Sequence, residues 1–69
     1  MANFYPYTID IDAKLVVGKG YIAQFVIGRV SGEVLYERSL PKLQSSYSEA
    51  LAHAYDVARA AVATLKGDN

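Results

Sequence analysis

The stretch from Ser46 to Lys66, SYSEALAHAYDVARAAVATLK, constrains the fold more than any other part of the chain. Ser46 followed by Glu49 forms an S-x-x-E capping box, in which each side chain satisfies an orphan backbone N–H at the start of a helix. Apolar residues then recur at intervals of three and four, and Gly67 follows as a C-terminal stop. The pattern predicts one amphipathic helix over about residues 46–66.

The apolar stripe of this helix has small side chains in its middle. With about 100° of rotation per residue, six apolar residues fall at the centre of the stripe and four more lie beside them. The centre is Tyr47, Leu51, Ala54, Ala58, Ala61 and Leu65, and the flanks are Ala50, Tyr55, Val57 and Val62. Because alanine lets a helix lie close to its neighbour, we expect the helix to cover one face of a sheet.

Length and composition limit the chain to one small domain over residues 1–69. It has 69 residues with 52% hydrophobic side chains and no cysteine, which excludes disulfides and thiolate metal sites. Seven basic residues balance seven acidic ones, so no strong electrostatic attraction to nucleic acid or to an anionic membrane is expected. Because a signal peptide and an apolar run of about 18 residues are both missing, we expect a soluble, cytoplasmic protein.

The residues before the helix read as three antiparallel strands. Residues 7–17 alternate between apolar and polar, residues 21–30 are apolar on both sides as in a central strand, and residues 33–40 form a third strand that Pro41 ends. Gly18–Gly20 and Ser31–Gly32 separate them as hairpin loops. The sequence therefore predicts an α+β domain, a three-stranded sheet in the order 1-2-3 with the C-terminal helix packed on one face.

The lengths of the two loops predict which residues share a face. A three-residue first loop places Leu15 opposite Ala23, and a two-residue second loop places Ile27 opposite Tyr36 and Arg29 opposite Val34. With these loop lengths, the apolar residues of all three strands lie on the face of the sheet that the helix covers. The predicted sheet core is Tyr7, Ile9, Ile11, Leu15, Val17, Ala23, Phe25, Ile27, Val34, Tyr36 and Leu40.

The other face of the sheet is predicted to stay open, because one helix covers only one side. It combines an apolar centre with a polar rim, which is typical of a protein–protein interface. The predicted interface residues are Val16, Ile22, Gln24, Val26, Val30, Leu35 and Glu37, and the rim adds Asp10, Asp12, Lys14 and Glu33. The alternative is that β-branched residues occur here because they favour strands. We expect self-association or docking of a protein partner through this face or through an edge strand.

Other polar residues are interpreted as surface groups. Asp10 and Asp12 project from one side of a strand, where paired carboxylates hold a divalent ion or exchange protons, but an open surface favours plain solvation. His53 lies between Glu49 and Asp56 on the outer helix face and is interpreted as solvated rather than as a base or metal ligand. We predict no metal site, no cofactor, no small-molecule substrate and no catalytic constellation, hence no enzyme.

Two short motifs resemble known families. The β-β-β-α order, with Lys19-Gly20-Tyr21-Ile22-Ala23 and Ser46-Tyr47-Ser48-Glu49-Ala50-Leu51, is similar to HicB-type antitoxin domains and to double-stranded-RNA-binding domains without their first helix, over residues 7–66. The first resemblance implies neutralisation of a partner toxin. The second implies RNA binding, but Ser46–Glu49 stands where that family has a Lys-Lys-x-x-Lys cluster. The chain also resembles many small bacterial proteins of this size.

Overall fold

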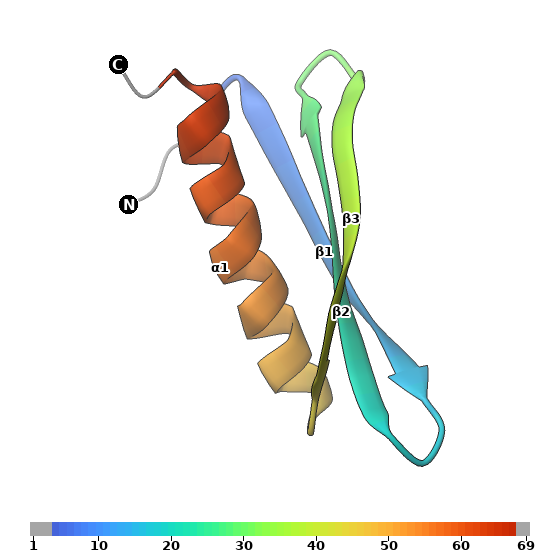
Figure 1. Ribbon diagram of the computed structural model, residues 1–69. Helices are drawn as coiled ribbons and strands as arrows, with labels where there is room; N and C mark the ends of the chain where they lie inside the picture. The colour runs from blue at the N-terminus through green and yellow to red at the C-terminus, as the bar shows by residue number, and fades with distance from the viewer. Residues whose placement is uncertain (1–3, 68–69) are drawn as a thin grey trace.

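The structure is a computed structural model that describes residues 4–67 (Figure 1). Three strands, β1 (Tyr7–Val16), β2 (Gly20–Arg29) and β3 (Val34–Gln44), precede one helix, α1 (Tyr47–Leu65). The strands form an antiparallel sheet in the order β1-β2-β3, and α1 packs on one face of it. The predicted α+β class and strand order are confirmed. Residues 1–3 and 68–69 of the predicted domain lie outside the described residues.

The ends of α1 follow the predicted signals. Ser46 is the N-cap, and its hydroxyl accepts the Glu49 N–H at 3.1 Å. The Glu49 carboxylate accepts a hydrogen bond from the Ser45 hydroxyl, one residue before the backbone N–H that the capping box predicts. Gly67 takes a φ of 89° directly after the C-cap residue Lys66, and its N–H donates to the Thr64 carbonyl at 3.0 Å. Local sequence therefore defines both ends of the helix.

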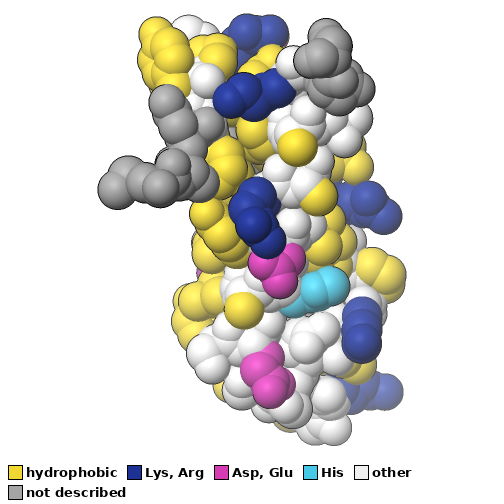
Figure 2. All heavy atoms as spheres, turned by 90° about the vertical axis from the view of Figure 1, so that its left-hand side faces the viewer, with side chains coloured by type: hydrophobic (Ala, Val, Ile, Leu, Met, Phe, Trp, Pro, Cys, Tyr) yellow, Lys and Arg dark blue, Asp and Glu magenta, His cyan; other side chains and the backbone are white. Residues whose placement is uncertain are grey.

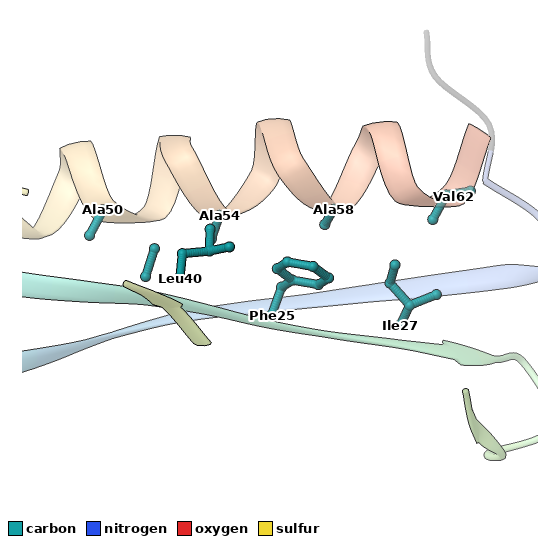
Figure 3. Close-up of a cluster of buried hydrophobic side chains, with 8 residues drawn as sticks. Phe25, Ile27, Leu40, Ala50, Ala54, Ala58 and Val62 are labelled. Atoms are coloured by element: carbon teal, nitrogen blue, oxygen red, sulfur yellow. The ribbon is translucent and has the colours of Figure 1, made fainter. Parts of the chain in front are cut away.

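The helix lies on the sheet along a ridge of small side chains (Figure 3). Its buried residues recur every four positions and are Ala50, Ala54, Ala58 and Val62. The predicted stripe faces the sheet as expected: Ala54 and Ala58 from its centre are buried, and Ala50 and Val62 from its flanks are buried with them. Tyr47 and Leu65, the first and last residues of α1, are exposed instead. The alanine ridge lets the helix lie close to Phe25 and Ile27, which larger side chains would hold apart.

The first hairpin has the predicted loop length but not the predicted register. Its loop is Val17–Lys19, so Ala13 rather than Leu15 lies opposite Ala23. Gly20, predicted to be in the loop, is the first residue of β2, and a Cβ added there would lie 2.5 Å from the Gln44 carbonyl oxygen. This close approach of β3 requires glycine in the strand. Because the pairing of β1 with β2 is shifted by two residues, each side chain still points to the face that was predicted for it.

The second hairpin departs twice from prediction. Arg29 N–H donates to the Glu33 carbonyl at 2.8 Å and Gly32 N–H to the Arg29 carbonyl at 2.8 Å, which gives a three-residue loop instead of two. A bulge then offsets the extra residue, so Val34 lies opposite Gly28, not Arg29, while Ile27 still lies opposite Tyr36.

The third strand also continues past its predicted end at Leu40. It runs to Gln44 through a second irregularity, where Ile22 pairs with Leu43 and Gln24 with Ser39. Pro41 lies in the extra segment between those pairs. An edge strand tolerates proline at such a place because the residue has no N–H to give to the ladder.

The core is smaller than predicted. The buried residues from the sheet are Ala23, Phe25, Ile27 and Leu40, with Tyr7, Ile9 and Ile11 partly buried beside them. Four predicted core residues are exposed instead, with Leu15 at 57%, Val17 at 85%, Val34 at 56% and Tyr36 at 41%. The end of the first hairpin extends beyond the helix (Figure 1), and Leu15 and Val17 lie near this end.

Candidate functional site

The face of the sheet turned away from α1 is organised in rows across the three strands. One row joins Asp10, Val26 and Glu37, and the next joins Asp12, Gln24 and Ser39. Directly opposed residues share a face, and Phe25 between the two rows points to the helix. A further row joins Lys14, Ile22 and Leu43. We call these three rows the open face.

The middle of the open face is a shallow hollow of about 410 Å³. It is lined by the side chains of the two central rows, and Phe25 and Arg38 also border it along their strands. The Arg38 guanidinium itself lies on the helix side, because it donates to the Tyr36 hydroxyl at 3.4 Å and Tyr36 stacks beside Phe25. The hollow is therefore formed by Val26 and Gln24 between carboxylates on both sides.

Four of the seven predicted interface residues lie in these rows, namely Ile22, Gln24, Val26 and Glu37. Val16 lies opposite Gly20 at the hairpin end of the same face. Each of the four apolar or amide side chains, Val16, Ile22, Gln24 and Val26, is half-buried. Alternation along the first two strands was enough to bring these residues together.

The structure places Leu35 and Val30 elsewhere. Leu35 lines a second hollow of about 360 Å³ with Tyr36, next to Ala61, Thr64 and Leu65 of α1, so it lies on the helix side. The bulge after Val34 causes this, because an extra residue exchanges the faces of its neighbours. Val30 lies in the turn after β2, where its N–H donates to the Pro6 carbonyl at 3.0 Å.

Sequence reasoning missed three residues of this side of the sheet. Leu43 was missed because the third strand was expected to end before Pro41, and Val34 because the bulge was not foreseen. Ser39 lies within the predicted strand, but it was not included among the predicted interface residues. The proline was itself a signal, since a proline within a strand pattern points to a bulge on an edge strand. Nothing in the sequence marks the bulge at Leu35.

A side-chain hydrogen bond and an excess of carboxylates distinguish the open face. The Gln24 side-chain amide donates to the Ser39 hydroxyl at 3.1 Å, which holds the centre of one row. Three of the seven acidic residues of the chain, Asp10, Asp12 and Glu37, lie in the rows, against one of the seven basic residues, Lys14. The open face is thus acidic on a chain with no net charge.

Both edges of the sheet are blunted against further strand pairing. On β1, the Ala13 N–H donates to the Asp12 carboxylate at 2.8 Å, so this backbone donor is already satisfied. On β3, two irregularities and Pro41 leave only a short regular stretch. Charged side chains, bulges and proline are the usual devices that prevent edge-to-edge association. The open face is therefore better suited to association than either edge.

The outer side of α1 holds the remaining candidate, His53 (Figure 2). Its two predicted charge partners are engaged elsewhere: Asp56 pairs with Arg59 at 3.2 Å, and Glu49 accepts from Ser45. Glu33, predicted on the rim of the open face, pairs with Arg29 at 3.4 Å. Within residues 4–67, no group of three or more His, Cys, Asp or Glu residues is placed to hold a metal ion.

The described part of the chain contains no helix that is long and apolar enough to cross a membrane. Comparison of the chain with protein-family models, with curated proteins and with solved structures finds no match.

Proposed function

We propose that this chain is a non-enzymatic protein-interaction module whose docking surface is the open face. The observation that carries the proposal is the half-burial of Ile22 and Val26 on a sheet face that no described element covers. An apolar centre with a polar rim is the composition of protein interfaces. The blunted edges of β1 and β3 favour the face over strand addition.

Two alternatives follow from the family resemblances. An antitoxin-like domain is a special case of the proposal, in which the docked protein is a toxin. Nucleic-acid binding is disfavoured at the open face, because the carboxylates of Asp10, Asp12 and Glu37 repel a phosphate backbone. A basic cluster at the start of α1 is also missing, since Ser46–Glu49 contains no lysine or arginine.

Site-specific photo-crosslinking in the cells that make the protein tests the proposal. A photoreactive residue at Val26 reports on the open face, and the same residue at the exposed Ala60 reports on the outer side of α1. We expect irradiation to join Val26, but not Ala60, to a discrete protein species. That species is either a second copy of the chain or another protein, and mass spectrometry distinguishes them.

Sedimentation of the purified chain over a range of concentrations provides the second readout. A chain that stays monomeric throughout, together with no protein crosslink from Val26, would overturn the proposal.

A further inference from the structure

We infer that the occupant of the open face is an amphipathic helix of another protein, with lysine or arginine residues on both flanks of an apolar stripe. This inference rests on the proposed function and names the partner class of that surface. Three features of the open face support it: the positions of the carboxylates, the spacing of the apolar residues and the net charge.

The first feature is that carboxylates stand on both sides of the central strand. Asp10 and Asp12 lie on β1, Glu37 lies on β3, and Val26 lies between them on β2. Neighbouring strands are about 4.8 Å apart, so the two acidic flanks are separated by about 10 Å. This is close to the diameter of a helix with its side chains, about 10–12 Å. A helix laid along β2 therefore presents one flank to the carboxylates of β1 and the other to the carboxylate of Glu37 on β3.

The second feature is the spacing of the apolar residues. Ile22 and Val26 are four residues apart on β2 and face the same way, which corresponds to about 13 Å along the strand. Two turns of helix advance about 11 Å, so residues seven or eight apart on one helical stripe reach both. The apolar stripe of the bound helix would lie over Ile22 and Val26, with Gln24 between them.

The third feature is the net charge of the face, which argues against a second copy of this chain. Two copies stacked on one another so that their central rows overlap would bring Asp10 and Asp12 of one copy opposite Asp12, Asp10 or Glu37 of the other. Like charges placed opposite each other across an interface are unfavourable. A basic partner turns the same carboxylates into favourable contacts and gains speed of association from them.

Titration of the isotope-labelled full chain by NMR tests the inference. The probe is a synthetic helical peptide of about 18 residues with a leucine stripe flanked by lysines on both sides. The matched control peptide has glutamate in place of every lysine. We expect saturable shifts in the amides of β2 and of its neighbours Asp10 and Glu37 with the lysine peptide only, and weaker binding as salt is raised.

Two variants with the same change in net charge separate the open face from the rest of the surface. D10K/E37K reverses the flanks and should weaken binding of the lysine peptide about tenfold or more. E33K/D56K reverses two exposed carboxylates outside the open face and should leave the affinity within about twofold. Circular dichroism of both variants checks that the fold is kept.

The inference and the proposed function fail in different ways. Equal binding of the two peptides, no binding of either, or equal weakening by both variants would overturn the inference. So would a second copy of the chain crosslinked to Val26. The proposed function survives each of these results as long as Val26, and not Ala60, crosslinks to a protein.

Discussion

Phe25 and Val26 are neighbours in the chain, yet they lie on two faces of the sheet with different roles. Phe25 is 2% exposed beneath the alanine ridge of α1, whereas Val26 is half-buried between carboxylates. The same alternation separates Ile27 from Gly28 and Ala23 from Gln24. Strand β2 therefore contributes to both the helix-covered core and the open face, because successive side chains of a strand point to opposite faces.

The contrast indicates where the stability of the domain resides. Burial of an aliphatic or aromatic side chain contributes about 1.5–3 kcal/mol when it is complete, and only the helix-covered face achieves this. The open face contributes less to folding, so its residues are free to be selected for binding. Seven substitutions in four experiments test this division, and the experiments are ordered by the size of the expected effect on the free energy of unfolding.

The largest difference is expected between Phe25→Ala and Val26→Ala. The first leaves a cavity under α1 and should cost about 3–5 kcal/mol, which is comparable to the whole stability of a domain of this size. The second removes half-buried methyl groups and should cost about 0.5–1 kcal/mol. Urea unfolding followed by circular dichroism measures both. Similar losses would mean that the two faces support the fold equally.

Overpacking beneath the helix should come next. Ala54 is fully buried between α1 and the sheet, so Ala54→Leu forces the two apart and should cost about 1–3 kcal/mol. Ala52→Leu is the matched control, because Ala52 is exposed on the same helix and should change stability by less than about 0.5 kcal/mol. If Ala54→Leu were as well tolerated as its control, close packing of the ridge would not be what holds the helix down.

A smaller loss should follow from removing the cap of the covering helix. Ser46→Ala deletes the hydroxyl that accepts the Glu49 N–H and should cost about 1 kcal/mol. Ser48→Ala, inside the first turn, should be neutral or slightly stabilising because alanine is the better helix former. The thermal midpoints of the two variants give the comparison. A Ser46→Ala variant as stable as the parent would show that packing alone sets the start of α1.

The smallest effect is expected on the open face itself. Gln24→Val removes the bond to Ser39 but adds a β-branched side chain to a strand, so stability should stay within about 0.5 kcal/mol. The variant also joins Ile22 and Val26 into one apolar strip, and sedimentation should then detect more self-association. A loss above about 1 kcal/mol would assign Gln24 a structural role.

Prediction from sequence succeeded for the faces of β1 and β2 and failed for their detailed pairing. Alternation of apolar and polar residues has a period of two, so a register error of two residues in the first hairpin left every side chain on its expected face. The error arose because Gly20 looks like a loop residue, while its role is to let the Gln44 carbonyl approach. Gly20 and Gln44 are distant in sequence, so no local sequence pattern predicts their contact.

The second hairpin shows how two errors can cancel. The loop has one residue more than predicted and the bulge at Leu35 adds one to β3, so Ile27 still meets Tyr36. Between the loop and the bulge the cancellation does not hold, and there Val34 and Leu35 exchanged faces. The interface prediction lost Leu35 for this reason, and it retained Gln24 and Val26 because they lie on the regular part of β2.

Local interactions along the sequence determined the number and order of elements, the limits of α1 and the face of each residue in β1 and β2. Period, caps and glycines act over a few residues, so they can be read without the fold. Tertiary packing decided which residues of the predicted helical stripe are fully buried, where β3 bulges and how far β3 continues past Pro41. These features depend on the fit between surfaces that are far apart in the chain, and only the folded molecule brings those surfaces into contact.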